Sequence, residues 1–377
     1  MRVLVTGASG GVGRSVMEGL LAENVQVRAS SRDPQQARMP TGVELAAADL
    51  NQPDTMARAL GGVSAVFLYA QGKKLPELMA TTKEVGVEYV VFLSTIDATN
   101  QHDYAQHNRR RHLEVEEAVA AAGFRYTFLR PAAFATNALR FWRQSIVAEG
   151  VVRIPFPEAQ QAPIDERDIA AVGVRALASR KLDGAALVLT GPESLTQRKQ
   201  LECISNVVGR PIRLETMTEE QARAWLEKII PVAYVNLLIA QWRDEVGAAA
   251  RVTDNVERVT GRPVTPYAAG LRAMPMPSAW CESILPPTPC QWAAEALVPS
   301  AENSKYKVQS LEASPAGANF HWRAACKARF AKYWLGPGES IVASVTLPEG
   351  STLTWMPTLT VPRIVPMAFC DTSGRTW

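Results

Sequence analysis

Three glycines near the start of the chain have the spacing that a phosphate-binding loop requires. Gly7, Gly10 and Gly13 follow a short apolar run at 2–5 and lead into a helical stretch at 14–23. The N-terminus of a helix offers unpaired N–H groups and a positive dipole end, and a β-carbon at the closest positions would hold a phosphate away. Gly7 permits a tight turn, Gly10 permits close approach of a diphosphate, and Gly13 lets the helix pack on the strand. We therefore expect a dinucleotide site, rather than a glycine-rich turn without a ligand, formed by Thr6, Gly7, Ser9, Gly10, Gly11, Val12 and Gly13.

The end of the second predicted strand carries positive charge and hydroxyl groups before its first carboxylate. Arg28, Ser30, Ser31 and Arg32 all precede Asp33. Enzymes that use NAD place a carboxylate here for the ribose 2′-hydroxyl, whereas a 2′-phosphate requires a cation and hydroxyl donors. We predict that Ser31 and Arg32 hold the 2′-phosphate of NADP, which makes NAD the less favoured cofactor. The alternative is that Arg32 is a solvated loop residue.

The next three predicted strands also end in residues that we assign to the cofactor cleft. Asp49 and Leu50 follow the third strand, Ala70 follows the fourth, and Ser94 follows the fifth. Asp49 could accept a hydrogen bond from the adenine amino group, or it could cap the next helix. Ser94 could hold a ribose or the substrate, or it could satisfy a backbone group of its loop.

All of these residues require a sheet whose strands end at one edge. Strand and helix signals alternate through the first half of the chain, and the predicted strands are continuously apolar, which indicates a parallel sheet covered on both faces. We predict an α/β fold with a doubly wound, Rossmann-type sheet, right-handed crossovers and a ligand beyond the carboxyl ends of the strands. The predicted strands are 2–5, 25–29, 43–47, 65–69, 89–93 and 126–129, and the predicted helices are 14–23, 53–59, 76–85 and 110–122.

The pattern becomes weaker from about Phe134. Segments 151–155 and 160–163 could pair as short strands, and segment 186–189 reads as a further strand. The remaining signals are helical, which predicts a smaller, mostly helical substrate lobe. We expect one domain over 1–272, with a core at 1–133 and the lobe at 134–272, and the lobe helices at 165–177, 195–208, 219–228 and 229–247.

The composition changes after residue 272. The last part of the chain holds 12 of the 25 prolines and six of the nine tryptophans, and its helical periodicity is poor. We treat 273–377 as an extension of unknown structure, with a hairpin of 340–347 and 351–361 as its one structural prediction. Three interpretations are open: a poorly ordered extension, a small β-unit, or a sequence that was not selected for packing.

Composition and charge exclude several classes of protein. A hydrophobic content of 47% and a charged content of 20% are typical of a globular protein with a sizeable core. The net charge of +3 favours neither nucleic acid nor a membrane surface as a partner. The longest apolar stretch, 229–242, contains Pro231, Asn236 and Gln241, so we expect a buried helix rather than a membrane span.

Cysteine spacing and the position of the first strand bear on the cellular compartment. The five cysteines form no C-x-x-C pair and none lies near a histidine pair at zinc spacing, so we expect no metal site. Because the first strand begins at residue 2, we also expect no leader segment. These observations favour a reduced, cytoplasmic protein.

Four segments together resemble one known family. Residues 6–13 resemble the glycine loop of atypical short-chain dehydrogenases/reductases. Residues 129–134 with Asn137 resemble the "LRP..F..N" segment of the NmrA-like group, 164–170 resemble its entry into a helix, and 189–193 resemble its "LTGPE" turn. The order and spacing of the segments agree with that family over roughly residues 1 to 270.

The resemblance implies cofactor chemistry but leaves the reaction open. The NmrA-like family includes NADPH-dependent quinone or azo reductases, isoflavone-type reductases and redox-sensing regulators. By the resemblance, Phe134 and Asn137 line the substrate side of the cleft. The family's reductases carry a lysine where this chain has His112. His112 could hold the nicotinamide ribose or donate a proton, or it could be an exposed residue beside three arginines.

The Tyr-x-x-x-Lys pair of ordinary short-chain dehydrogenases is missing from its expected place. Tyr104 lies before the corresponding helix, but position 108 is asparagine. A second match, Tyr69 with Lys73, follows the fourth strand instead of lying on a helix, and we interpret it as chance. The missing pair argues against an alcohol dehydrogenase but not against quinone reduction, because hydride can add first to an electron-poor quinone.

Two functions from different classes follow. The first is an NADPH-dependent oxidoreductase that passes hydride to a quinone-like or other conjugated small molecule. The second is a regulator that senses NADP(H) without catalysis and acts through a protein partner. A homodimer is compatible with either function. An isomerase that uses bound cofactor is a weaker third hypothesis, because the missing Tyr/Lys pair counts against it.

Overall fold

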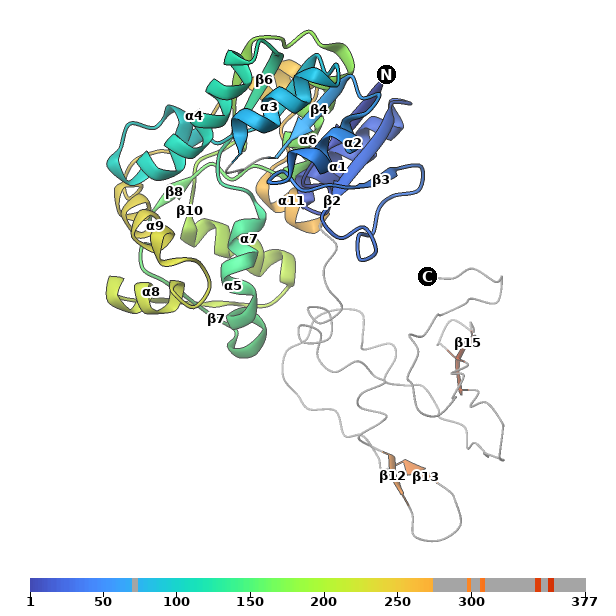
Figure 1. Ribbon diagram of the computed structural model, residues 1–377. Coiled ribbons are helices and arrows are strands. Elements are labelled where there is room, and N and C mark those ends of the chain that lie inside the picture. The colour runs from blue at the N-terminus through green and yellow to red at the C-terminus, as the bar shows by residue number, and fades with distance from the viewer. Residues whose placement is uncertain (70–73, 274–296, 300–305, 309–342, 347–351, 356–377) are drawn as a thin grey trace. The chain divides into compact units, whose positions relative to one another are not determined.

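A parallel sheet organises the first part of the chain. The computed structural model describes residues 1–69, 74–273, 297–299, 306–308, 343–346 and 352–355. Seven parallel strands form one sheet in the order β3-β2-β1-β4-β5-β6-β9 (Figure 1). This order confirms the predicted doubly wound sheet, because the strands fan out to both sides of β1. The strands are β1 (Arg2–Val5), β2 (Gln26–Ser31), β3 (Glu44–Ala47), β4 (Ala65–Leu68), β5 (Tyr89–Leu93), β6 (Arg125–Pro131) and β9 (Ala185–Leu189).

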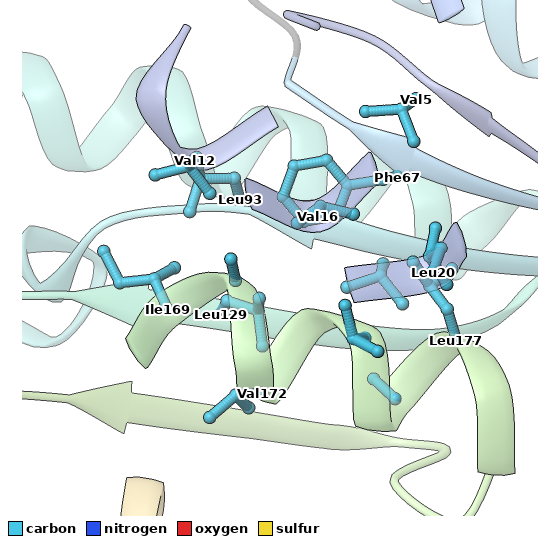
Figure 2. Packing of buried hydrophobic residues seen from close by; sticks show 14 of the residues in the cluster. Val5, Val12, Val16, Leu20, Phe67, Leu93, Leu129, Ile169, Val172 and Leu177 are labelled. Carbon is cyan, nitrogen blue, oxygen red and sulfur yellow. The ribbon is translucent and has the colours of Figure 1, made fainter. Parts of the chain in front are cut away.

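Helices cover both faces of the sheet. Successive residues of a strand point to opposite faces, and because the strands are apolar throughout, both faces need a cover. Val3 and Val5 of β1 belong to the core on one face, and Leu4 belongs to the core on the other. The first core packs the sheet against α1 (Gly11–Ala22) and α6 (Glu166–Ser179). Figure 2 shows this packing, in which Val12, Val16 and Leu20 of α1 and Ile169 and Leu177 of α6 belong to one cluster with Phe67, Leu93 and Leu129.

The opposite face carries three other helices. They are α2 (Pro53–Leu60), α3 (Leu75–Glu84) and α4 (Gln106–Ala121). Two short 3₁₀ segments, η1 (Ile96–Thr99) and η2 (Asp103–Ala105), connect β5 to α4. Each fully buried Val, Leu or Phe of these cores contributes about 1.5–3 kcal/mol relative to exposure, so the sheet is held rigidly under its carboxyl edge.

The lobe that follows β6 is mostly helical, as predicted. Its helices form two apolar clusters, one around Trp142 and Ile204 and one around Leu226 and Ile239. The elements are α5 (Thr136–Glu149), β7 (Val151–Ile154), β8 (Gln160–Gln161), β10 (Leu195–Thr196), α7 (Gln197–Val208), β11 (Arg213–Thr216), α8 (Glu219–Leu226), α9 (Val232–Asp244) and α11 (Tyr267–Arg272). Three elements from the range predicted as the lobe, α6, β9 and α10 (Asn255–Thr260), instead belong to the core of the main sheet.

The prediction for the lobe was wrong in two further respects. Segments 151–155 and 160–163 do not pair with each other, because β7 pairs in parallel with β11 and β8 pairs antiparallel with β10. Helix α5 was not predicted, although Ala138, Trp142 and Ile146 recur every four residues and are buried along one side of it. Both errors concern segments whose partners lie far along the chain.

The chain divides into the units Met1–Ile284 and Leu285–Trp377. In the second unit β12 (Leu297–Pro299) pairs with β13 (Tyr306–Val308), and β14 (Ala343–Thr346) pairs antiparallel with β15 (Thr352–Trp355). The second pairing agrees with the predicted hairpin, whose turn lies outside the described residues. Four of the five cysteines, at 281, 290, 326 and 370, also lie outside them.

Candidate functional site

The glycine loop presents a bare helix start at the carboxyl edge of the sheet. Gly7 has a φ of +64°, which a residue with a side chain rarely adopts, and its carbonyl accepts the Gly10 amide at 3.0 Å. A β-carbon on Gly13 would lie 2.4 Å from that same carbonyl oxygen, so only glycine lets α1 begin here. Gly10 is the N-cap of α1 and provides no side-chain hydrogen bond, and the first turn holds no acid. The exposed start of α1 therefore fits the predicted phosphate.

Thr6 holds the loop to the neighbouring strand. Its hydroxyl is buried, donates to the Phe67 carbonyl at 3.1 Å and accepts the Tyr69 amide at 2.6 Å. A β-carbon on Gly7 would lie 2.9 Å from the Tyr69 ring, so the tyrosine borders the turn. Ala70 and Lys73, which the sequence also singled out, lie outside the described residues.

The arginines of β2 have different roles. Arg28 is buried, donates to the carbonyls of Ala59 and Gly61 at 2.6 and 2.8 Å, and pairs with Glu44 at 2.8 Å. It therefore closes the C-terminal end of α2. Arg32 follows the carboxyl end of β2 and is exposed, and the Ser31 hydroxyl accepts the Asp33 amide at 3.1 Å. A contact between Arg32 or Ser31 and a ribose 2′-phosphate stays a prediction.

Asp49 does not cap the following helix, which corrects one of its two predicted roles. The N-cap of α2 is Gln52, and its side chain makes no capping bond. The Asp49 carboxylate instead accepts the backbone amide of Asn51 at 2.9 Å and its side-chain amide at 3.3 Å. This contact forms a tight turn after β3. A contact between Asp49 or its neighbour Leu50 and adenine stays a prediction.

Ser94 belongs to a hydrogen-bonded group of polar side chains that links the end of β5, helix α4 and strand β6. Its hydroxyl donates to Glu116 Oε1 at 2.5 Å, and Arg130 Nε donates to the same oxygen at 3.0 Å. A terminal nitrogen of Arg130 also contacts Glu116 Oε2. The predicted alternative, that Ser94 satisfies a loop backbone group with its hydroxyl, is therefore wrong. Neither Glu116 nor Arg130 was singled out as a site residue.

His112 is buried on α4, one turn before Glu116, rather than exposed beside the arginines. Its Nδ1 lies 2.9 Å from the Asn108 carbonyl oxygen. Because a carbonyl oxygen only accepts, Nδ1 must carry a proton and Nε2 is then free to accept. Burial, reinforced by the Arg111 charge, lowers the pKa of His112. The neutral ring is thus a hydrogen-bond acceptor at neutral pH.

Asn108, which stands where the dehydrogenase lysine would be, contacts a carboxyl group instead. Its side-chain amide donates to Asp97 Oδ2 at 2.6 Å. Asp97 lies in η1, directly beyond β5, and burial raises its pKa. The Tyr104 hydroxyl accepts the Asn100 side-chain amide at 3.2 Å, and burial raises the pKa of this phenol as well. A raised pKa is the opposite of what a catalytic tyrosinate requires.

Glu245 brings a second unusual carboxyl group from the lobe to this region. It follows α9 and accepts the side-chain amides of Gln161 and Gln241 at 3.0 and 2.8 Å. Burial raises the pKa of Glu245 to about 7, and the charge of Asp97 adds to the effect. Sequence reasoning missed both carboxyl groups, because nothing in their local spacing distinguishes them from surface acids.

The predicted substrate residues lie where the lobe leaves the sheet. Phe134 forms a bridge with Ile164, and its carbonyl accepts the Asn137 amide at 3.0 Å in the first turn of α5. Both side chains are partly buried. Within the described part of the chain, no group of three or more His, Cys, Asp or Glu could hold a metal ion. Among the same residues, no helix is long and apolar enough to cross a bilayer.

Comparison with known proteins identifies the family. The profile of the NmrA-like family matches residues 1–263. The chain belongs to the NmrA-like family. It is 38% identical to the (4-alkanoyl-5-oxo-2,5-dihydrofuran-3-yl)methyl phosphate reductase of Streptomyces griseus, over 70% of this chain and 95% of the relative. It is 32% identical to the NAD(P)H azoreductase of Xenophilus azovorans, over 72% and 97%.

Solved structures agree on the fold of this NmrA-like protein. The triphenylmethane reductase of Citrobacter sp. superposes with a TM-score of 0.61 at 21% identity, covering 72% of this chain and 98% of that one. An NADPH-dependent quinone oxidoreductase of Escherichia coli gives 0.60 at 21% identity, covering 71% and 98%. At 21% sequence identity, the similarity to these structures establishes the fold alone.

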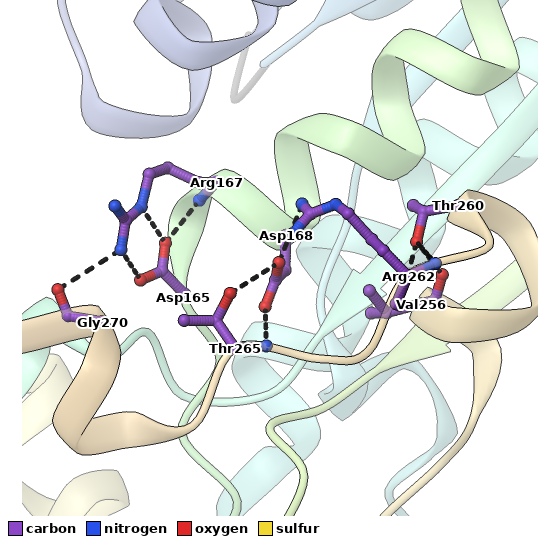
Figure 3. Close-up of polar contacts among 8 residues, drawn as sticks. All are labelled: Asp165, Arg167, Asp168, Val256, Thr260, Arg262, Thr265 and Gly270. Carbon is purple, nitrogen blue, oxygen red and sulfur yellow. Dashed lines mark hydrogen bonds and ion pairs between the residues drawn. The ribbon is translucent and has the colours of Figure 1, made fainter. Parts of the chain in front are cut away.

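Two of the NmrA-like segments hold the fold together. Asp165 caps α6 by accepting the Arg167 amide at 2.8 Å, and Asp168 accepts the Thr265 amide at 2.8 Å and the Arg262 side chain at 2.9 Å (Figure 3). Burial alone would raise the pKa of Asp165, but the hydrogen bonds from Arg167 hold this pKa below its usual value. In the "LTGPE" turn, a β-carbon on Gly191 would lie 2.1 Å from the Pro163 carbonyl oxygen. These segments secure the last helices to the sheet.

Proposed function

We propose that this protein is an NADPH-dependent reductase that passes a hydride to a conjugated small-molecule acceptor. The observation that carries the proposal is the relative named as a reductase, which is 38% identical over 95% of its own length. The azoreductase relative, whose name includes NAD(P)H, supports the same cofactor. The uncapped start of α1 supplies a place for the diphosphate.

The residues at the carboxyl edge fit a nicotinamide dinucleotide. The backbone amides of Gly11 and Val12 would hold the diphosphate, and Arg32 with Ser31 would hold the 2′-phosphate. When bound, the reduced nicotinamide supplies the hydride. Asp49 and Leu50 stay the proposed contacts of the adenine side, and Ser94 that of the nicotinamide side.

The acceptor class follows from what the relatives' names have in common. The furan derivative carries a carbon–carbon double bond conjugated with two carbonyl groups, and an azo compound carries a conjugated N=N bond. Both are electron-poor π-systems to which hydride can add before any proton arrives. This fits Tyr104, because burial raises the pKa of its phenol instead of lowering it.

The reduced acceptor then requires one proton. We assign the neutral His112 to hydrogen-bond acceptance from a ribose hydroxyl rather than to proton donation, since its Nδ1 proton is engaged by the Asn108 carbonyl. Asp97 and Glu245 hold their protons to higher pH than ordinary carboxyl groups, so they and water are the proposed proton sources. Phe134 and Asn137 would line the acceptor side.

Turnover with defined acceptors tests the proposal. Oxidation of NADPH and NADH is followed at the nicotinamide absorbance with an acyl-butenolide phosphate, an azo dye and a quinone. We expect NADPH to be oxidised with at least one acceptor and NADH to be the poorer donor. Tight NADPH binding without turnover on any acceptor would overturn the reductase and support the regulator acting through a protein partner.

A further inference from the structure

A buried carboxyl group borders the glycine loop. Glu166 lies in the first turn of α6, and its β- and γ-carbons are 3.9 Å from the position that a β-carbon on Gly11 would take. Gly11 is the first residue of α1, where the dinucleotide diphosphate is proposed to bind. Only 8% of Glu166 is exposed, so little water separates its charge from the glycine loop.

The same carboxyl group joins the loop to the substrate lobe. The Thr136 hydroxyl, in the first residue of α5, donates to Glu166 Oε1. The starts of three helices, α1, α5 and α6, therefore meet around one acidic side chain. Glu166 therefore contacts both the glycine loop and the start of α5, the helix that carries Asn137.

Among the residues that the structure describes, the groups that face Glu166 do not supply a compensating cation. From its own helix come Asp165 and Arg167, and the Arg167 guanidinium is directed at Asp165 and at the Gly270 carbonyl, at 2.8 and 3.3 Å (Figure 3). From α11 comes Tyr267, whose buried hydroxyl has no hydrogen-bond partner among the described residues. Gly11 of α1 and Thr136 of α5 bring no charge.

The electrostatics of this arrangement disfavour a second anion. Burial raises the pKa of Glu166, the Thr136 hydrogen bond lowers it, and Asp165 raises it. A diphosphate placed against Gly11 adds negative charge at short range in a site of low dielectric, and a neighbouring like charge raises a carboxyl pKa further. A neutral carboxyl group, unlike a carboxylate, can also donate a hydrogen bond to a phosphate oxygen.

We infer that Glu166 takes up one proton from solvent when the dinucleotide diphosphate binds, so that cofactor affinity is linked to pH through this residue. The inference rests on the proposed function, because it requires a nicotinamide dinucleotide at the glycine loop. The linkage has a defined sign. Below the pKa of the free protein Glu166 already holds its proton, and above that value binding must bring one in and weakens as pH rises.

Calorimetry measures this proton directly. NADPH and NADH are titrated into the full chain between pH 6 and 9, in pairs of buffers with equal pH and different ionisation enthalpies. We expect the wild type to take up close to one proton in part of this range, and its affinity to fall by up to about tenfold per pH unit there. NADH shares the diphosphate but lacks the titrating 2′-phosphate, so its proton uptake reports Glu166 without that contribution.

Matched variants assign the proton to Glu166. Glu166→Gln should abolish the uptake and flatten the pH dependence, while Glu18→Gln, an exposed carboxyl group on α1, should leave both unchanged. Thr136→Val removes the hydrogen bond that stabilises the carboxylate and should move the uptake to higher pH. This second variant tests the inference if Glu166→Gln does not fold.

The outcomes separate this inference from the proposed function. Equal proton uptake by the wild type, Glu166→Gln and Thr136→Val would overturn the role of Glu166 and leave cofactor binding intact. Binding of NADH with no net proton uptake at any pH would do the same. Failure of the wild type to bind either nucleotide would instead overturn the proposed function, and with it the linkage.

Discussion

Glu116 of α4 and Arg130 of β6 form a buried ion pair beneath the carboxyl ends of β5 and β6. Arg130 Nε lies 3.0 Å from Glu116 Oε1, which also accepts the Ser94 hydroxyl at 2.5 Å. The Glu116 side chain is 5% exposed and that of Arg130 is 19% exposed. The pair fixes α4, and with it His112, against the strands that end at the proposed nicotinamide site.

Loss of one partner of this pair should destabilise the protein strongly. Glu116→Ala leaves Arg130 without its counter-charge in a water-poor place, and the free energy of unfolding should fall by about 3 kcal/mol. The double variant Glu116→Leu with Arg130→Met removes both charges and should recover most of that loss. Urea unfolding gives both values.

The exposed pair of Arg110 with Glu114 on the same helix is the control, since Arg110→Ala should cost less than about 0.5 kcal/mol. Equal losses at the two pairs would contradict a structural role for Glu116.

Alanine substitutions at two glycines of the loop should have different effects, one on stability and the other on cofactor binding. A β-carbon on Gly13 would lie 2.4 Å from the Gly7 carbonyl oxygen, so Gly13→Ala should lower the free energy of unfolding by about 1–3 kcal/mol. A β-carbon on Gly10 meets the same oxygen only at 3.4 Å, an ordinary contact, so Gly10→Ala should fold normally.

Gly10→Ala should nevertheless weaken NADPH about tenfold or more, because its methyl group holds a phosphate away from charge-assisted hydrogen bonds. Unfolding curves and calorimetry measure the two effects. Unchanged NADPH affinity in a folded Gly10→Ala would reject the diphosphate assignment.

Arg32 should bind the 2′-phosphate and so distinguish NADPH from NADH. Arg32→Ala removes charge-assisted hydrogen bonds worth about 1.5–3 kcal/mol, so NADPH affinity should fall roughly ten- to hundredfold while NADH affinity changes little. Calorimetry with both nucleotides gives the comparison. Arg58→Ala, an exposed arginine on α2, serves as the matched control. A loss of the same size for NADH as for NADPH would return Arg32 to the alternative of a solvated loop residue.

Glu245 should make stability depend on pH. Its pKa is raised from 4.5 to about 7 in the folded protein, mainly by burial. Between these values the unfolded chain loses the proton first, so rising pH favours unfolding, and the effect is complete above pH 7. Glu245→Gln cannot ionise. The unfolding free energy of the variant minus that of the wild type should therefore grow by about 3 kcal/mol from pH 4.5 to pH 8.

Urea unfolding of both proteins across this pH range measures the difference, in which the titration of all other groups cancels. A difference that stays constant from pH 4.5 to pH 8 would show that Glu245 ionises as an exposed carboxyl group does. It would also remove Glu245 from the proposed proton sources.

Local spacing along the chain was enough to predict the sheet and the glycine loop. The alternation of apolar strands with helices implied the parallel order, and Gly7, Gly10 and Gly13 implied the bare start of α1. Each of these signals lies within about fifteen residues, where backbone geometry and side-chain periodicity act directly. The start of the weaker lobe pattern near Phe134 was visible for the same reason.

Contacts between distant segments required the folded molecule. Arg28 and Arg32 look equivalent in the sequence, yet one closes α2 and the other faces solvent. Glu166 and Gly11 become neighbours because α1 and α6 pack on the same face of the sheet. Which charge is buried, and what it then meets, depends on how whole elements pack together, and no local pattern of residue types contains that information.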